Sequence, residues 1–290
     1  MEHLTLHTDD GHTLAARCYR PAAGGEARRV VLIGPALGVP QSFYERYARW
    51  LTGHGAVVYT LDWRGIGESA PKDLRRYRAR LIDWALQDAP AFMRLAQQRH
   101  PKLPMSWLGH SMGGILFGLM PQLAQMDHVV TLGSGSGHVR YLARPLRYLM
   151  GVFWHVLVPL SVARHGYFAG KRLNAVGDLP RGIVGQWKRW CASPDYVCSE
   201  SDAVKTAYAR VARPMTAVWF ADDKIASAAG IRAVHEPYTS AEVRYVNLRP
   251  QDIGAATVGH FDFFHARTGP RGWAHSLPWL GLVPAASTPP

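Results

Sequence analysis

Short apolar runs alternate with amphipathic stretches along most of the chain. The runs are rich in β-branched residues, whereas the stretches between them repeat apolar side chains at spacings of three and four. Uninterrupted apolar strands separated by helices are typical of a parallel sheet that helices cover on both faces. We therefore predict an α/β fold, with strands at 29–34, 56–62, 105–109, 128–134, 215–222 and 242–248 and helices at 43–51, 89–98, 114–120 and 225–236.

Three segments depart from this alternation. Residues 4–19 alternate apolar and polar positions around Asp10-Gly11, which predicts an antiparallel ribbon with a tight turn. Residues 138–210 are rich in arginine and aromatic side chains and have helical periodicity. They are predicted to form a helical cap inserted into a core of residues 1–137 and 211–290. The closing PAASTPP, at 284–290, is predicted to be a disordered tail.

The positive net charge of the chain favours anionic partners but does not identify one. Lys and Arg number 33 and Asp and Glu 21, which gives a formal net charge of +12. The positive residues are spread along the sequence, and their densest run, RRYRAR at 75–80, is either a solvated face or an anion-binding patch. Because no nucleic-acid-binding motif accompanies that run, we expect no nucleic-acid partner.

Cysteine usage and hydropathy predict a soluble, cytoplasmic protein. The three cysteines, Cys18, Cys191 and Cys198, are odd in number and form no CxxC pair, which indicates reduced thiols. The first residues do not resemble a secretory signal. The longest uncharged stretch, 148–163, has 16 residues and contains a proline, so it is shorter than the roughly 18 to 20 residues that a membrane-spanning helix needs.

A serine between glycines is the first candidate for chemistry. LGHSMGG, at 108–114, follows the predicted strand 105–109 and opens a predicted helix, so Ser111 lies on the turn between them. Gly109 and Gly113 suit so sharp a turn, because a Cβ there would collide with the adjoining backbone. A helix N-terminus offers unpaired N–H groups to a developing negative charge. The pattern indicates a nucleophilic serine, and the alternative is a glycine-rich turn with an incidental serine.

With this motif, the sequence resembles the α/β-hydrolase superfamily, and most of all its serine aminopeptidase and monoacylglycerol-lipase branch. DWRGIGES, at 62–69, is similar to the DxRGxGxS motif of that branch, whose role is largely structural. The resemblance runs through nearly the whole chain and is weakest in the cap. It implies an α/β-hydrolase fold with a mostly parallel central sheet, and catalytic residues in the order Ser, Asp or Glu, His.

The acid that the resemblance implies is Asp223. ADDKIAS, at 221–227, is similar to the family's (G/A)xDxIxP loop and follows a predicted strand, although Ser227 replaces the proline. Asp222 is the alternative acid, and both aspartates could instead be charges at a helix N-terminus.

The predicted base is His260. It lies in TVGHFDFF, at 257–264, which resembles the family's GHxxFF. Among the other histidines beyond the acid, His235 is too close to it in sequence to return over the sheet. His265 and His275 are expected at the surface or facing the cap.

Two backbone N–H groups are expected to form an oxyanion hole. One is that of Met112, which follows the serine. The other belongs to GPALGV, at 34–39, where many relatives carry His-Gly-x-Gly. That alignment makes Leu37 the second donor, and Pro35, which has no N–H, departs from the pattern.

These residues predict a serine hydrolase in which Ser111 attacks an acyl carbonyl, His260 is the general base and Asp223 orients it. We expect no cofactor and no metal. The aromatic cap favours a carboxylic ester with an apolar acyl group, and a lipid at a membrane surface is a further option. The alternatives are an acyltransferase, a thioesterase or an aminopeptidase with the same triad, or a non-catalytic binding module. The sequence predicts no oligomeric state.

Overall fold

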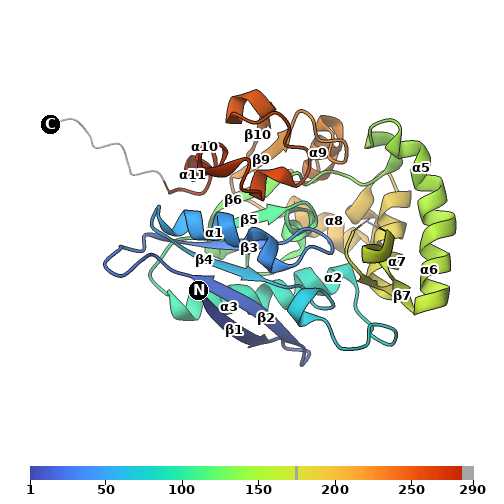
Figure 1. The fold of residues 1–290 in the computed structure, drawn as a ribbon, viewed down its shortest axis with the longest axis horizontal. Helices are drawn as coiled ribbons and strands as arrows, with labels where there is room; N and C mark the ends of the chain where they lie inside the picture. Colours follow the sequence, from blue (N-terminus) through green and yellow to red (C-terminus); the bar gives the residue numbers. More distant parts are fainter. Residues whose placement is uncertain (174–175, 283–290) are drawn as a thin grey trace.

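An eight-stranded sheet forms the centre of the molecule. The computed structural model describes residues 1–173 and 176–282, so the predicted tail at 284–290 lies outside the described residues. The strands are Glu2–His7 (β1), Thr13–Tyr19 (β2), Arg29–Gly34 (β3), Ala56–Leu61 (β4), Met105–His110 (β5), Met126–Leu132 (β6), Met215–Phe220 (β9) and Val243–Leu248 (β10), in the order β1-β2-β4-β3-β5-β6-β9-β10 (Figure 1). β2 is antiparallel to β1 and β4, and the remaining pairs are parallel. The predicted α/β fold and its opening ribbon are confirmed.

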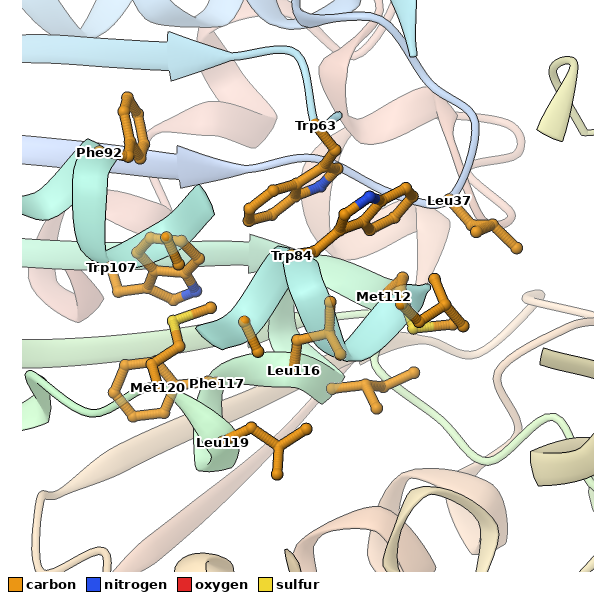
Figure 2. Packing of buried hydrophobic residues seen from close by; sticks show 14 of the residues in the cluster. Leu37, Trp63, Trp84, Phe92, Trp107, Met112, Leu116, Phe117, Leu119 and Met120 are labelled. Carbon is orange, nitrogen blue, oxygen red and sulfur yellow. The ribbon is translucent and has the colours of Figure 1, made fainter. Parts of the chain in front are cut away.

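The two faces of the sheet bury separate apolar layers. Val30 and Leu32 of β3 belong to one layer, whereas Val31 and Ile33 belong to the other, as the alternation of side chains along a strand requires. Helices α1, α10 and α11 cover the second layer, and α3 covers the first, part of which Figure 2 shows. These helices span Glu45–Thr52, Gly269–Trp273, Ser276–Trp279 and Ala89–Arg99, respectively.

The helix after β5 is shorter than predicted. Instead of one helix over 114–120, α4 spans only Met112–Ile115 and a 3₁₀ turn follows at Leu116–Leu119. The Tyr208 hydroxyl donates a short hydrogen bond to the Ile115 carbonyl. Because that carbonyl is taken by a side chain of α8 (Asp202–Ala209), it is less available to continue the α-helical ladder.

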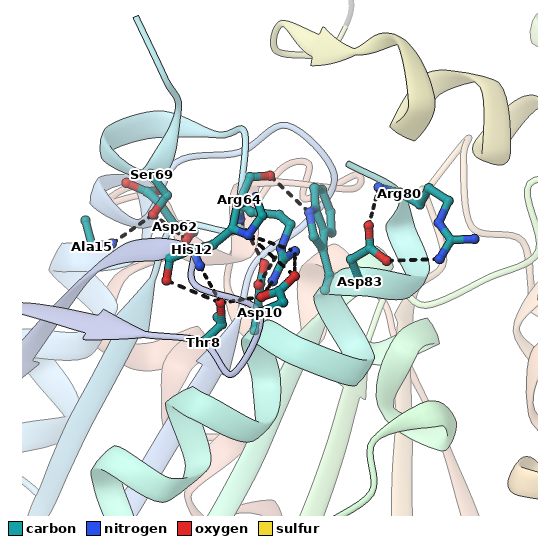
Figure 3. Close-up of polar contacts among 11 residues, drawn as sticks. Thr8, Asp10, His12, Ala15, Asp62, Arg64, Ser69, Arg80 and Asp83 are labelled. Atoms are coloured by element: carbon teal, nitrogen blue, oxygen red, sulfur yellow. Dashed lines mark hydrogen bonds and ion pairs between the residues drawn. The ribbon is translucent and has the colours of Figure 1, made fainter. Parts of the chain in front are cut away.

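The DWRGIGES segment is a structural turn after β4. The Asp62 carboxylate accepts hydrogen bonds from the backbone N–H groups of Gln41 and Glu68, at 2.6 and 2.9 Å. Arg64 is buried and pairs with Asp88 at 2.7 Å, and it also contacts Asp10 in the hairpin turn (Figure 3). These contacts tie the turn to the first ribbon, in agreement with a structural role for the motif.

Residues 138–210 form helices beyond the carboxyl ends of the central strands (Figure 1). They contain α5 (Leu146–Val152), a π-helical turn (Phe153–Leu157), α6 (Val158–His165), the strand pair β7 (Tyr167–Phe168) and β8 (Leu179–Pro180), α7 (Arg181–Ala192) and α8. A Cβ on Gly38, in the loop after β3, would lie 2.7 Å from the backbone nitrogen of Gly177. This segment therefore packs tightly against the loop after β3. The division of the chain at residues 138 and 210 stays a prediction.

One helix in this segment is longer than the sequence suggested. The expected limit was the 16-residue uncharged stretch, but α5, the π-helical turn and α6 run on as 20 residues, Leu146–His165. By length and composition alone this helix could cross a membrane, and within residues 1–173 and 176–282 it is the one helix for which this holds. Only 17% of its most apolar window is buried.

Candidate active site

Ser111 lies at the tip of β5 in a strained conformation. Its φ is 51° and its ψ −115°, in the left-handed half of the map that residues other than glycine rarely adopt. A Cβ on Gly113 would lie 2.1 Å from the Gly34 carbonyl oxygen, and one on Gly109 would lie 2.4 Å from Gly114. The crowding inferred from the sequence is therefore present, and it lets Ser111 stand out at the carboxyl edge of the sheet.

Asp223 and His260 form a buried pair at the same edge. His260 Nδ1 lies 2.7 Å from Asp223 Oδ2, and the two side chains are 5% and 0% exposed. The other carboxylate oxygen, Oδ1, accepts the backbone N–H groups of Ile225 and Ala226, at 2.8 and 3.0 Å. Since both oxygens are held, the carboxylate is fixed in orientation, and its partner nitrogen on the imidazole carries the proton.

Asp222 has a different task. Its two carboxylate oxygens accept the backbone N–H groups of Val258 and Gly259, at 2.8 and 3.0 Å. It therefore holds the loop that carries His260, while Asp223 contacts the imidazole itself. The sequence left the two aspartates as alternatives, and the geometry separates them.

Ser111 and His260 both neighbour the end of β6. The Ser111 N–H donates to the Leu132 carbonyl at 2.8 Å, and a Cβ on the next residue, Gly133, would lie 3.1 Å from the His260 ring. Within the described part of the chain, no hydrogen bond joins the Ser111 hydroxyl to His260. Hydrogen bonds of this kind are often long in enzymes without substrate and tighten when it binds.

The loop after β3, whose first residues lie against Gly113, contains an N–H group without an acceptor in the part of the chain that the structure describes. The Ala36 N–H donates to the Tyr44 hydroxyl at 2.9 Å, so it is not available to a substrate. Among the described residues, the N–H groups of Leu37 and Met112 have no acceptor. Figure 2 shows the Leu37 and Met112 side chains at the same end of the apolar cluster.

His110 is a residue of the site that the sequence analysis missed. The Tyr44 hydroxyl, which accepts the Ala36 N–H, lies 2.9 Å from His110 Nδ1, and His110 Nε2 lies 2.9 Å from the His260 carbonyl oxygen. This order of partners makes Nδ1 the acceptor and Nε2 the donor. Burial lowers the pKa of His110 to about 3, so the ring is neutral at physiological pH. The only signal was its place next to Ser111 in the motif.

The other late histidines lie elsewhere. His235 is buried in α9 (Ala228–His235), where Nδ1 lies 2.8 Å from the Ile231 carbonyl and Nε2 2.8 Å from the Thr131 hydroxyl. His265 is exposed beside Asp262, at 3.3 Å, and His275 is half-buried at the N-cap of α11.

One apolar cluster connects the site loops to the cap. Leu37 and Met112 belong to the same buried cluster as Trp154, Phe168 and Leu179 of the cap.

Two cavities, of about 280 and 370 Å³, have linings that do not include Ser111. The first is lined by Arg78, Ala79, Arg80, Asp83, Arg181 and Gly182, and the second by Ser42, Phe43, Arg46, Phe264, His265, Ala266 and Arg267. Over the ranges 1–173 and 176–282, no cluster of three or more His, Cys, Asp or Glu side chains could hold a metal ion.

Comparison with known proteins adds a family and a fold. The family model for serine aminopeptidase S33 hydrolases matches residues 25–174. A monoacylglycerol lipase of Mycolicibacterium smegmatis is 34% identical over 89 residues, which are 31% of either protein, so the match spans about a third of that relative's length.

Solved structures are similar over most of the chain. A hydrolase of Pseudomonas aeruginosa has a TM-score of 0.57 at 18% identity, over 97% of this chain and 98% of that one. A thermostable carboxyl esterase of Bacillus coagulans has a TM-score of 0.53 at 16% identity, over 86% and 89%. At such identities the likeness is one of fold.

Proposed function

The chain belongs to the serine aminopeptidase S33 family and has the α/β-hydrolase fold, and from this premise we propose that it hydrolyses carboxylic esters with Ser111, His260 and Asp223. The observation that carries the proposal is the buried contact of 2.7 Å between His260 Nδ1 and Asp223, beside a serine whose φ is 51°. The Nδ1 proton is directed to the carboxylate, which leaves Nε2 as the basic nitrogen.

In the first half-reaction, His260 Nε2 removes the hydroxyl proton of Ser111 as Oγ bonds to the acyl carbon. The tetrahedral intermediate then breaks the ester bond, and His260 returns that proton to the departing alkoxide. In the second half-reaction, water attacks the acyl-serine, His260 takes the water's proton, and Ser111 leaves with it. Throughout, Asp223 keeps the tautomer and stabilises the imidazolium.

The negative oxygen of each intermediate needs donors that are already in place. The free N–H groups of Leu37 and Met112 fit this task, each donor being worth roughly 3 kcal/mol of barrier. Ala36 is unsuited because its N–H is engaged by Tyr44. The departure at Pro35 therefore leaves the proposed oxyanion hole intact.

An apolar acyl group suits the site better than a charged one. The cluster that contains Leu37 and Met112 continues into Trp154, Phe168 and Leu179 of the cap. This apolar continuity favours an ester over an aminoacyl amide, whose free α-amino group would need a carboxylate partner.

The triad is tested by paired variants. Ser111→Ala and His260→Gln should each abolish turnover of p-nitrophenyl butyrate and labelling by a fluorophosphonate, with the circular dichroism spectrum unchanged. His265→Gln is the matched control, since it also removes a histidine beside a carboxylate, and it should retain full activity. Substantial turnover by the Ser111 variant would refute the assignment.

The substrate class is tested on the wild-type enzyme. We expect kcat/KM for p-nitrophenyl esters to rise from acetyl to medium acyl chains, because each buried CH₂ adds about 0.8 kcal/mol of binding. A preference for acetyl, for a thioester or for an aminoacyl amide would contradict the ester proposal. Product analysis with added alcohols distinguishes hydrolysis from acyl transfer.

A further inference from the structure

The helix Leu146–His165 exposes an apolar stripe to solvent. Of the eleven large hydrophobic side chains that are exposed in the described chain, six lie on this helix. We call them the outer stripe: Tyr148, Leu149, Val152, Val156, Leu157 and Leu160, which are 64, 59, 54, 45, 40 and 63% exposed. Leu149, Val152, Val156 and Leu160 follow one another at steps of three and four, so they share one face of the helix. A contiguous stripe of this kind marks an interaction surface rather than scattered surface residues.

The opposite face anchors the helix flat on the cap. Trp154 and Val158 are buried, and the Trp154 ring packs edge-on against Trp187 of α7, with centroids 4.7 Å apart. The Lys188 ammonium donates to the Trp154 carbonyl at 2.8 Å. In Figure 1 the helix lies at the outer edge of the molecule. Its 20 residues correspond to a length of about 30 Å. Because one face is bound to the cap, only the outer stripe is free to meet a partner, and the helix would lie along a surface rather than cross it.

The charged residues in and near this helix are all positive, which favours an anionic partner. Between His128 and Gly177 the sequence has no acidic residue and six basic ones, at Arg140, Arg144, Arg147, Arg164, Lys171 and Arg172. Arg147 and Arg164 lie within the helix near its two ends, outside its uncharged middle. An apolar face framed by cations is the composition of helices that lie in the interface of an anionic bilayer. A second copy of the chain is disfavoured, because a two-fold contact would bring the Arg147 and Arg164 of one copy near those of the other with no acidic residue on either helix.

We propose that the outer stripe docks the protein on anionic lipid bilayers, with the apolar side chains inserted at the level of the headgroups and the flanking arginines against lipid phosphates. The proposal does not depend on the hydrolase chemistry, since it concerns a surface and not the triad. If both hold, docking would turn the cap, which packs over the site loops, toward the bilayer.

Vesicle sedimentation of the full chain tests the proposal without any turnover. Vesicles of phosphatidylcholine with roughly one third phosphatidylglycerol should bind the wild type at least about tenfold more tightly than pure phosphatidylcholine, and added salt should weaken the binding. The double variant Val152→Glu, Leu160→Glu should lose at least about tenfold of this affinity. Leu86→Glu, at an apolar side chain on the core that is 42% exposed, is the matched control and should bind like the wild type.

Turnover of soluble p-nitrophenyl butyrate and the unfolding midpoint should stay the same in all three proteins, which separates docking from folding and chemistry. Equal vesicle binding by the wild type and the double variant would overturn the proposal, as would the absence of binding by the wild type. A wild-type dimer in light scattering that the double variant converts to monomers, with no vesicle binding, would assign the stripe to a second copy instead.

Discussion

Two buried histidines should make the fold lose stability in mild acid. Burial lowers the pKa of His110 to about 3 and that of His235 to about 4, from an ordinary value of 6.5. Each ring also has both nitrogens engaged, with one donating to a backbone carbonyl and one accepting from a hydroxyl. A proton on the accepting nitrogen would break that hydrogen bond, so protonation of either ring is unfavourable in the folded state.

The size of the effect follows from proton linkage. The folded-state pKa is depressed in both cases, so the stability that depends on the neutral rings is complete above pH 6.5. It is lost as the pH falls toward about 4 for His235 and about 3 for His110. Each ring costs about 1.4 kcal/mol per pH unit in this window. At pH 5 the two together should lower the free energy of unfolding by about 4 kcal/mol relative to pH 7.5, a value set by the unfolded chain alone because both folded pKa values lie below 5.

His235→Gln isolates one half of this loss. His235 is hydrogen-bonded to Thr131 and Ile231 and to no residue of the proposed triad, and glutamine keeps a donor and an acceptor without a titrating proton. Urea unfolding followed by tryptophan fluorescence at pH 7.5 and 5 should show that the variant loses about 2 kcal/mol less than the wild type between the two pH values. His265→Gln, which removes an exposed histidine, should leave the loss unchanged. If the wild type and His235→Gln lose the same free energy over this interval, the reasoning about buried neutral rings is wrong.

Two further pairs of substitutions test how the site is held together. Tyr44→Phe removes the hydroxyl that connects Ala36 with His110, and it should cost about 2 kcal/mol of unfolding free energy and lower kcat. Tyr47 is also fully buried, and its hydroxyl lies 2.6 Å from that of a serine, so Tyr47→Phe should cost similar stability with kcat unchanged. Steady-state kinetics and urea unfolding measure the two effects. Asp223→Asn should lower kcat by about 10⁴-fold because it disturbs the tautomer of His260. Asp222→Asn should lower kcat by at most about a hundredfold because it only loosens the loop, and equal losses would contradict the separate roles assigned to the two aspartates.

Much of the fold could be predicted because its signal is local. A central parallel strand such as β5 is buried on both faces, so MSWLGH reads as an apolar run whatever its neighbours are. Glycines at 109 and 113 likewise follow from a turn that admits no Cβ, and the crowding around them is present. The family's chain order of Ser, Asp and His then restricted the predicted base to the last loops of the sheet, where His260 lies beside Asp223.

What could not be predicted depends on contacts between distant segments. Asp222 and Asp223 are adjacent and chemically identical, and only the loop at 258–260 decides which of them meets the imidazole. An apolar helix in a sequence is expected to be buried, so the exposure of the outer stripe becomes evident only when the cap is packed on the core. The length of α4 depended on Tyr208, more than ninety residues away.

One chain of hydrogen bonds relates all three parts of the proposed mechanism. It runs from the Ala36 N–H, in the oxyanion loop, through the Tyr44 hydroxyl and His110 to the backbone carbonyl of His260. His110 also directly precedes Ser111 in the chain. One buried and uncharged ring therefore connects the segments that carry the proposed base, nucleophile and oxyanion donors. A positively charged ring in its place would repel the imidazolium that the proposed mechanism forms on His260. The depressed pKa of His110 thus allows one histidine to connect these loops beside a second histidine that, in the proposed mechanism, gains a proton.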